Sequence, residues 1–451
     1  MSLKNKIITV VCEKIVFPGR SLCRCEDGLA LFTDWLLPKE KAEVLVIRDK
    51  KTYREGILKN IILKSDDRIK PKCKSFVVCG GCRFQNLSYE NQLTLKQEYL
   101  EELLSFITGL NISKILPSPV QWYYRNKMEF SFFNNNGELD LGLHERGSFN
   151  RYISVPPCFI ADKDFSKVVE LVKNFAKKSN LTAYNNKIHE GFFRHLVLRK
   201  AQNNGQLLVN IVTNELTVGE DVLDPIVKEL SVFVDSLYWT INYKKSDSII
   251  PNKLILLSGN SFIREKLEVG GKNFYFNISP FSFFQTNSKG TEVLYNQVLK
   301  LLRPCKHDIL LDLYCGAGII GLSVARNVKG IVGVDIIPEA IVNAKENAVI
   351  NSIGNAQFFV SSCQDWVNTT EYKFDLIVVD PPRAGLTKDV INFLLSSKAK
   401  RIVYVSCNLS TLARDLQIII KNDKYRPIEI VPVDVFAHTS HVEVIVALES
   451  N

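Results

Sequence analysis

The stretch that decides the fold is Leu311-Asp312-Leu313-Tyr314-Cys315-Gly316-Ala317-Gly318-Ile319-Ile320-Gly321. It ends an apolar run and opens a helical pattern, so it predicts a tight turn between a strand and a helix. Gly316, Gly318 and Gly321 also have the spacing of a dinucleotide-binding turn. A single match of this kind is weak, and a purely structural strand–helix turn explains it as well.

Strand–helix alternation continues downstream of this turn. Apolar runs recur at Ile331–Asp335, Phe374–Asp380 and Arg401–Ser406. This rhythm predicts a doubly wound α/β domain, in which ligands bind beyond the carboxyl ends of the strands. Asp335 stands where such folds place a carboxylate that binds the ribose hydroxyls of a cofactor. NAD and S-adenosylmethionine both contain that ribose, so this pattern fits either cofactor.

The sequence Asp380-Pro381-Pro382-Arg383 ends the fourth strand of the set and discriminates further. Its prolines stiffen an extended turn over the predicted cleft. Asp-Pro-Pro at this place resembles the signature of methyltransferases that act on planar nitrogen-containing substrates. In members that methylate amino groups an aromatic residue usually follows the prolines, so Arg383 argues against that chemistry. A structural proline turn is the alternative explanation.

A thiol and a carboxylate lie beside apolar runs near the end of the chain. Cys407, in Ser406-Cys407-Asn408, comes just after a strand, within reach of a bound substrate. Glu443 closes the polar cluster His438–Glu443, which also adjoins an apolar run. A nucleophile and a base on neighbouring strand ends can perform covalent catalysis. Taken alone, Cys407 fits a buried core thiol and Glu443 fits a salt-bridged surface carboxylate.

The first half of the chain has the pattern of β structure. Short strands separated by turns, which suggest a small β-barrel, are predicted at Lys6–Val16, Gly28–Thr33, Ala42–Arg48 and Glu55–Leu63. A helix is predicted over Tyr89–Ile107, and residues 125–270 alternate as further strands. No apolar run is long enough to cross a membrane and no signal peptide is evident, so a cytoplasmic protein is expected.

Positive charge is concentrated away from the predicted α/β domain. The chain of 451 residues has a formal net charge of +9. Residues 1–75 contain 17 Lys or Arg against 10 Asp or Glu, whereas residues 271–451 contain 18 against 17. A basic module joined to a near-neutral catalytic module suits a polyanionic substrate such as nucleic acid. Lysine-rich solvated surfaces would give the same count.

Three of the eleven cysteines form a compact cluster, Cys73-x5-Cys79-Gly80-Gly81-Cys82, and Cys158 is available as a fourth ligand. Four thiolates suit a [4Fe–4S] cluster or a tetrahedral zinc ion. The spacing is not that of paired zinc knuckles. Because nothing indicates secretion, a disulfide framework is improbable and a metal role is favoured for the clustered thiols.

Taken together, these residues resemble the RNA 5-methyluridine methyltransferase family. The resemblance covers nearly the whole chain, and its carriers are Phe283–Asn287, Asp312–Gly318, Asp380–Gly385, Ser406–Asn408 and His438–Glu443. It implies a multidomain α/β protein with three parts. These are a TRAM-like, OB-type β-barrel over 1–65, a central mixed α+β domain with an iron–sulfur loop over 66–270, and a Rossmann-like class I methyltransferase domain over 271–451.

The resemblance also implies roles for single residues. Cys407 would be the nucleophile and Glu443 the general base. S-adenosylmethionine would be held by Gln285, Tyr314, Gly316, Asp335 and Asp380. RNA would be contacted by Phe283, Arg125 and Lys127. A structural [4Fe–4S] cluster would be bound by Cys73, Cys79, Cys82 and Cys158.

The barrel and the cysteine cluster resemble the subgroup that modifies a uridine of 23S ribosomal RNA, with the T-loop of transfer RNA as the alternative substrate. A monomer without an obligate protein partner is expected. One departure is visible, because the family usually has Phe-Pro where this chain has Phe436-Ala437, which leaves that loop less rigid.

Two other functions explain part of the pattern. An NAD-dependent oxidoreductase would explain the glycine spacing and Asp335, but it leaves Cys407, Glu443 and the paired prolines without a role. A non-catalytic RNA-binding protein would use the barrel and the central domain, but it leaves the catalytic pattern unexplained. The sequence therefore favours a methyltransferase.

Overall fold

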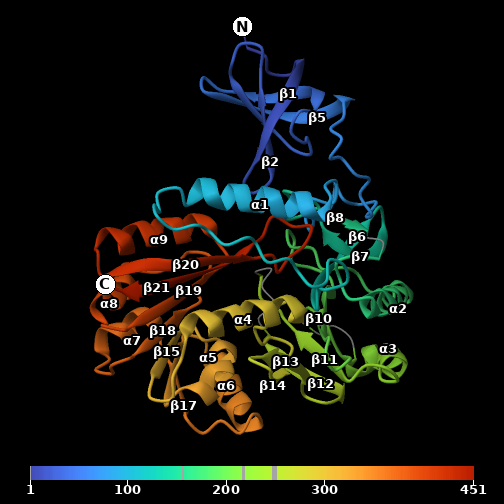
Figure 1. Ribbon diagram of the computed structural model, residues 1–451. Coiled ribbons are helices and arrows are strands. Elements are labelled where there is room, and N and C mark those ends of the chain that lie inside the picture. Colours follow the sequence, from blue (N-terminus) through green and yellow to red (C-terminus); the bar gives the residue numbers. More distant parts are fainter. Residues whose placement is uncertain (1, 155–156, 216–218, 246–250) are drawn as a thin grey trace.

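The computed structural model describes residues 2–154, 157–215, 219–245 and 251–451. Its first five strands close into a barrel with the order β1-β2-β3-β5-β4, which confirms the predicted barrel. The strands are β1 (Ile7–Val16), β2 (Arg20–Arg24), β3 (Ala30–Thr33), β4 (Lys41–Asp49) and β5 (Tyr53–Leu63). Alternate residues such as Val10, Leu31 and Val44 point into a small apolar core. The barrel stands apart at one end of the molecule (Figure 1).

Helix α1 (Tyr89–Leu103) lies between the barrel and the C-terminal sheet (Figure 1). Ser88 caps its first turn by accepting a hydrogen bond from the Asn91 backbone amide at 3.2 Å. Leu100 is fully buried in the core of the C-terminal sheet. Lys96, also buried, donates to Asp434 at 2.7 Å. The helix therefore joins the first half of the chain to the α/β half.

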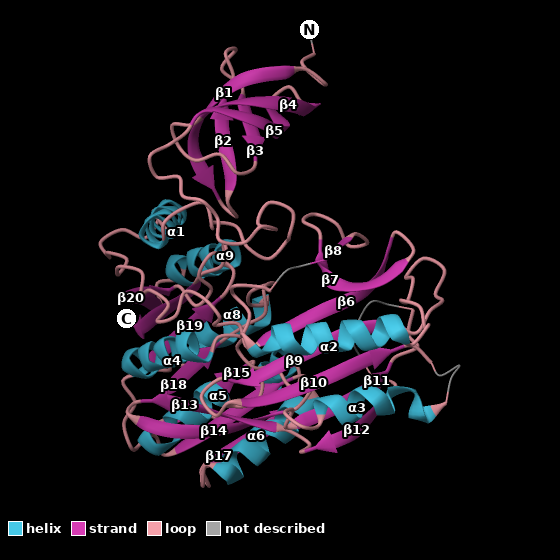
Figure 2. Ribbon diagram, turned by 90° about the vertical axis from the view of Figure 1, so that its right-hand side faces the viewer, coloured by secondary structure: helices cyan, strands magenta, loops and turns pink. Residues whose placement is uncertain are grey.

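A seven-stranded sheet forms the middle of the chain, in the order β12-β11-β10-β9-β6-β7-β8. Helices α2 and α3 cover one face of it (Figure 2), and the buried face of α2 repeats at Phe165, Val168, Val172 and Ala176. The elements are β6 (Lys127–Asn135), β7 (Glu138–His144), β8 (Tyr152–Ser154), α2 (Asp164–Lys178), β9 (Phe193–Ala201), β10 (Gln206–Thr213), α3 (Asp224–Leu230), β11 (Ser236–Ile241) and β12 (Lys253–Gly259).

A hairpin of β13 (Ile263–Val269) and β14 (Lys272–Ile278) connects this sheet to the C-terminal half. Its turn contains Gly270 and Gly271, both in the left-handed region that favours glycine. The apolar side of the hairpin, including Leu267 and Phe274, packs into the core of the C-terminal sheet. The domain division predicted at residue 270 thus lies in the turn of this hairpin.

The C-terminal half is a seven-stranded sheet with helices on both faces, in the order β17-β16-β15-β18-β19-β21-β20. Its elements are α4 (Ser288–Leu302), β15 (Ile309–Leu313), α5 (Ile319–Val324), β16 (Gly330–Asp335), α6 (Pro338–Ile350), β17 (Ala356–Val360), α7 (Cys363–Thr369), β18 (Leu376–Val379), α8 (Lys388–Ser396), β19 (Arg401–Ser406), α9 (Leu409–Lys421), β20 (Tyr425–Val433) and β21 (Glu443–Ser450).

One strand of this sheet runs against the others. The strands β17, β16, β15, β18 and β19 are parallel, but β21 pairs antiparallel with both β19 and β20. The dinucleotide-binding fold has six strands in the order 3-2-1-4-5-6 and lacks this insertion. The antiparallel strand has a consequence for function, because it brings the start of β21 to the carboxyl end of β19. In the described part of the chain, no helix is long and apolar enough to span a membrane.

Candidate active site

Five predicted site residues meet at the carboxyl edge of the C-terminal sheet. Tyr314 follows β15, Asp335 ends β16, Asp380 follows β18 and Cys407 follows β19. Glu443 reaches the same edge from the opposite direction, as the first residue of β21. This edge is where open α/β sheets bind their ligands.

The turn after β15 leaves room for a ligand at Gly316. A side chain built there would meet no atom within 4 Å, whereas one at Gly318 would press on the Phe358 ring at 3.0 Å. Tyr314 has φ 63°, a strained conformation for a bulky residue. Gly316 thus provides open backbone at the predicted cofactor position, and Gly318 is required for packing.

Asp335 is held rigidly beside this turn. Its Oδ2 accepts from the Gly316 amide at 2.9 Å, and its Oδ1 accepts from the Ile337 amide at 2.9 Å. Each carboxylate oxygen keeps a further lone pair for a ligand hydroxyl. The carboxylate oxygens of Asp335 and the open turn therefore fit an adenosine-containing cofactor such as S-adenosylmethionine.

Cys407 and Glu443 are brought together by strand register. Ser406 pairs with Val444 in the antiparallel ladder, so the next position at this end sets Cys407 opposite Glu443. Glu443 is 4% exposed and Cys407 is half-buried. Burial raises the pKa of Cys407 to about 11, and the neighbouring Glu443 charge adds to the rise. The resting site thus holds a protonated thiol facing a carboxyl group.

Burial also raises the pKa of Glu443, to about 8, and that of Asp380, to about 7. The charge of Asp380 raises the Glu443 pKa further, whereas Arg383 lowers the pKa of both Glu443 and Cys407. The Arg383 loop is fixed to the start of α9, because its carbonyl oxygen accepts from the Asn408 side-chain amide at 2.7 Å. Arg383 therefore favours the ionised forms of the thiol and the carboxylate.

Two residues near this site were not singled out from the sequence. Tyr295 on α4 is buried, hydrogen-bonds with the Gln285 side chain and lies near three carboxyl groups, which together with burial raise its pKa. Asp312 accepts from the Gly321 amide at 2.9 Å through Oδ2, while its buried Oδ1 has no partner. Asp312 belongs to the decisive turn and could have been found there. The Tyr295 position has only a helical pattern around it.

Gln285, Phe283, Arg125 and Lys127 lie together on the side of the central sheet. Asn126, between the two basic residues, donates its backbone amide to the Thr286 carbonyl at 2.9 Å and its side-chain amide to the Gln285 carbonyl at 3.2 Å. The Phe283 ring is 66% exposed. The start of β6 is thus joined directly to the loop that carries Phe283.

The four clustered cysteines also share one neighbourhood. Burial raises the pKa of the Cys82 thiol to about 12, and the charges of Cys158, Cys79 and Cys73 each add to the rise. Nitrogen donors face the sulfurs, since the Gly81 amide donates to Cys79 Sγ at 3.4 Å and the Gln85 amide to Cys82 Sγ at 3.2 Å. Such N–H donors stabilise ligating thiolates.

No three His, Cys, Asp or Glu side chains of the described residues form a group that could hold a metal ion. The four thiols nevertheless act on one another electrostatically, so they are near neighbours without converging on one point. The described residues therefore show no metal site at these four thiols, and the metal centre that the resemblance implies stays a prediction.

The cysteine loop is hydrogen-bonded to the loop before β21. The Arg83 and Phe84 amides, next to Cys82, donate to the His438 carbonyl at 2.7 and 3.0 Å. The Tyr124 hydroxyl donates to the Ala437 carbonyl at 2.9 Å, and Ala437 is fully buried. These contacts fix the Ala437 loop although it lacks the proline that the resembled family usually has there.

The fold and this edge define the class of protein, and comparisons with known proteins agree. A glycine-rich turn, a carboxylate that can bind ribose and a thiol–carboxylate pair are the parts of an S-adenosylmethionine-dependent RNA methyltransferase. Residues 88–451 match the model of the tRNA (Uracil-5-)-methyltransferase family, and the chain belongs to that family. It is therefore an RNA (uracil-C5-) methyltransferase, and this assignment removes both the oxidoreductase and the non-catalytic alternatives.

The relatives match over almost their full length. The chain is 37% identical over 456 residues to an uncharacterized RNA methyltransferase of Caldanaerobacter subterraneus, covering 99% of this chain and 100% of that protein. It is 36% identical to an uncharacterized RNA methyltransferase of Clostridium tetani, with 99% and 98% covered. The crystal structure of Pyrococcus abyssi tRNA (uracil-54, C5)-methyltransferase in complex with S-adenosyl-L-homocysteine matches with a TM-score of 0.78 and 29% identity, covering 98% and 100%.

Proposed function

We propose that this protein methylates C5 of a specific uridine in 23S ribosomal RNA through a covalent bond between Cys407 and C6 of the base. The observation that carries the proposal is the position of Cys407 opposite Glu443 at the end of the β19–β21 ladder. The reaction needs a nucleophile and a base on one substrate ring, and this pair supplies both.

The chemistry follows from the weak nucleophilicity of uracil C5. Addition of the Cys407 thiolate to C6 moves the electrons of the C5–C6 double bond into an enolate, which makes C5 nucleophilic. S-adenosylmethionine supplies the methyl group that C5 takes. Glu443 then removes the C5 proton, the double bond re-forms, and the C6–S bond breaks to release Cys407. Arg383 assists by favouring the thiolate and the carboxylate.

The residues that would hold S-adenosylmethionine surround the open turn. Gly316 offers unobstructed backbone and Asp335 its free lone pairs. Tyr314, Gln285 and Asp380 would complete the site, with Asp380 contributing a buried carboxyl group beside Glu443. Binding of S-adenosylhomocysteine by calorimetry, compared between wild type and Asp335→Ala, tests this assignment.

RNA would reach the site across the first half of the chain. Phe283 offers an exposed ring on which a base can stack, and Arg125 and Lys127 offer charge for the backbone. The barrel over residues 1–65 adds positive charge, and OB-type barrels bind nucleic acid. The domain divisions at residues 65 and 270 belong to this proposal, as does a monomeric state; limited proteolysis and light scattering test them.

A [4Fe–4S] cluster would be held by Cys73, Cys79, Cys82 and Cys158. None of the proposed steps needs electron transfer, so its role would be structural. It would stabilise the loop that the Arg83 and Phe84 amides join to His438. Anaerobic purification followed by iron and acid-labile sulfide analysis tests the cluster. About four of each per chain are expected, and zinc in their place would refute it.

Transfer RNA is the second candidate substrate, because the solved relative acts on uracil 54 of tRNA. Support for 23S ribosomal RNA comes from the barrel and the cysteine cluster that the resembled subgroup carries. Mass-spectrometric mapping of 5-methyluridine in both RNAs, from cells with and without the gene, distinguishes them. Loss of the mark from 23S RNA alone supports the proposal, and loss from tRNA alone assigns the second candidate.

A further inference from the structure

Two positively charged side chains lie next to each other on one face of the central sheet. Lys127 on β6 pairs directly with Arg199 on β9 in the antiparallel ladder, so both side chains leave the sheet on the same face. Like charges placed opposite each other in such a pair are destabilising. The repulsion between the two charges lowers the stability of the folded protein unless a bound anion compensates them.

Arg199 is the more unusual of the two. It is 3% exposed, and its guanidinium donates to the Ser282 carbonyl oxygen. Its Nε has no hydrogen-bond partner, and no carboxylate of the described residues forms an ion pair with it. Burial alone lowers its pKa to about 10. An uncompensated buried guanidinium is costly, which points to a missing partner.

Lys127 is the partly exposed neighbour of the buried Arg199 charge. It is half-buried, and the structure gives its ammonium group no hydrogen-bond acceptor among the described residues. Burial lowers its pKa to about 8, and the Arg199 charge lowers it further. Glu129, two residues along β6, is exposed and acts in the opposite direction more weakly. An anion that arrives at Lys127 from solvent would therefore come next to Arg199.

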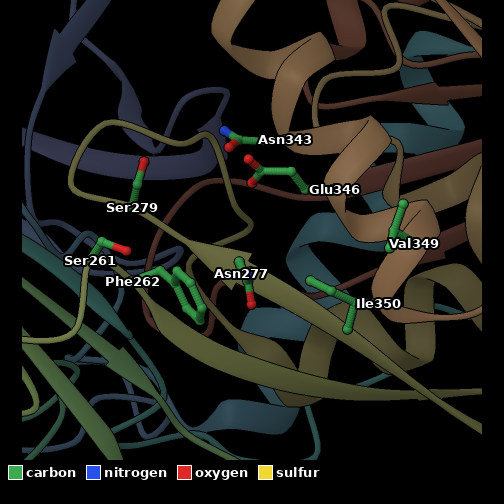
Figure 3. A pocket seen from close by; sticks show the side chains of 8 residues that line it. All are labelled: Ser261, Phe262, Asn277, Ser279, Asn343, Glu346, Val349 and Ile350. Carbon is green, nitrogen blue, oxygen red and sulfur yellow. The ribbon is translucent and has the colours of Figure 1, made fainter.

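The pair lies against the proposed RNA-binding loop. Ser282, which accepts from Arg199, immediately precedes the exposed Phe283. On its other side, the Ser282 hydroxyl accepts from the Asn343 amide at 3.1 Å. Asn343 borders a cavity of about 430 Å³ that also contains the Glu346 carboxylate (Figure 3). The Glu346 carboxylate disfavours a phosphate on that side, whereas the Lys127 and Arg199 cations favour one on theirs.

We propose that Lys127 and Arg199 together form an oxyanion site that receives a phosphodiester group of the substrate RNA, next to the nucleotide at Phe283. This inference rests on the proposed RNA substrate and adds Arg199, which no sequence pattern indicated. Arginine and lysine together give charge-assisted hydrogen bonds to phosphate oxygens. The bound phosphate compensates both cations. The two charges therefore lower the stability of the RNA-free protein and increase its affinity for RNA.

The stability of the RNA-free protein therefore separates this role from a purely structural one. Arg199→Met keeps the volume but removes the charge, so the thermal midpoint of the RNA-free protein should rise. Lys200→Met is the matched control, because Lys200 is the adjacent cation and is already paired with Asp164 at 2.5 Å. The control should not raise the midpoint. A lower midpoint for Arg199→Met would mean that Arg199 serves only to hold the Ser282 carbonyl, which overturns the proposal.

RNA binding supplies the second readout. A short oligouridylate, titrated at several salt concentrations by fluorescence anisotropy, should bind Arg199→Met about tenfold more weakly, with the salt slope reduced by about 0.7 for one lost phosphate contact. Lys127→Met should do the same, and Lys200→Met should leave the slope unchanged. An unchanged slope for Arg199→Met refutes the site.

A third measurement uses S-adenosylhomocysteine, because its carboxylate is another oxyanion that the site could bind. Its affinity, measured by calorimetry, should be the same in wild type and Arg199→Met. Loss of that affinity with unchanged oligouridylate binding would assign the site to the cofactor and overturn the RNA assignment. These binding and stability readouts do not depend on methyl transfer, so failure of the proposed RNA target is detected separately by the 5-methyluridine map.

Discussion

Cys407 and Glu443 face each other at the end of one antiparallel strand pair, because Ser406 pairs with Val444 at the position before them. The two residues come from opposite chain directions, and only the antiparallel strand β21 makes this possible. Both groups are buried enough to have raised pKa values, about 11 for Cys407 and about 8 for Glu443. The site therefore carries acid and base functions that change within the accessible pH range.

The pH dependence of turnover should follow this pair. Release of the methylated RNA should become faster as pH rises through about 8, because Glu443 must lose its proton before it can remove the C5 proton, and Cys407 forms more thiolate at the same time. Rates of release of the methylated RNA from the protein between pH 6 and 9 measure it. A rate that stays constant across this interval would contradict the assignment of Glu443.

Arg383→Met should shift that profile to higher pH. The Arg383 charge lowers the pKa of Glu443 and of Cys407, so its loss should raise both. Each unit of rise reduces the ionised fraction about tenfold at a pH below the pKa. The exposed Lys388, nearby on α8, gives the control Lys388→Met, whose profile should match that of wild type. Identical profiles for both variants would remove Arg383 from the account.

Lys96→Met should destabilise the protein strongly. Lys96 and Asp434 form a buried ion pair at 2.7 Å, and removing the lysine leaves a buried carboxylate uncompensated. Breaking such a pair costs about 3–5 kcal/mol. The exposed pair of Lys14 and Glu102 is the comparison, and Lys14→Met should cost less than about 1 kcal/mol. Thermal unfolding of both variants measures the difference, and equal midpoints would be inconsistent with a buried, energetically important pair.

Asp312→Asn should flatten the pH dependence of stability. Burial raises the pKa of Asp312 to about 8 from its ordinary value near 3.8, so the native state binds the proton more tightly than the unfolded chain. Its contribution to stability is complete below the unfolded pKa and is lost as pH rises towards 8. The thermal midpoint of wild type should therefore fall more steeply between pH 5 and 8 than that of the variant. Equal slopes would refute this linkage.

Cys82→Ser should loosen the loop before β21 as well as reduce bound iron. The residues after Cys82 donate two backbone hydrogen bonds to His438, so disturbance of the cysteine loop is transmitted to residues 436–442. Hydrogen exchange of that segment should become faster. Cys25→Ser, in the core of the barrel, should leave its exchange unchanged. Protection that persists in Cys82→Ser would show that the two loops are energetically independent.

Features encoded by neighbouring residues could be predicted from the sequence. The barrel strands, helix α1 and the strands β15, β16, β18 and β19 follow from apolar periodicity over short windows. The turn at Gly316 follows from glycine spacing. The placement of Cys407 at a strand end follows for the same reason, because it directly succeeds an apolar run.

Features that depend on pairing between distant segments of the chain could not be predicted from the sequence. The insertion of β21 between β19 and β20 sets Glu443 opposite Cys407, but no local pattern specifies that order. Tyr295 and Arg199 sit within ordinary helix and strand patterns, and their importance comes from the charges that the fold places around them. The division predicted at residue 270 lies in the turn between β13 and β14, because the pairing of these two strands joins the segments on either side of it.

Trapping of the covalent adduct tests the central claim most directly. Glu443→Gln should still allow Cys407 to attack C6 and C5 to accept the methyl group, but the C5 proton would remain, so the protein should stay bound to RNA in denaturing gels. Cys407→Ala and the double variant should form no such adduct, and Cys305→Ala, at an exposed thiol, should behave as wild type. An adduct that survives in the Cys407→Ala, Glu443→Gln double variant, or none with Glu443→Gln in the presence of substrate RNA and S-adenosylmethionine, would contradict the account.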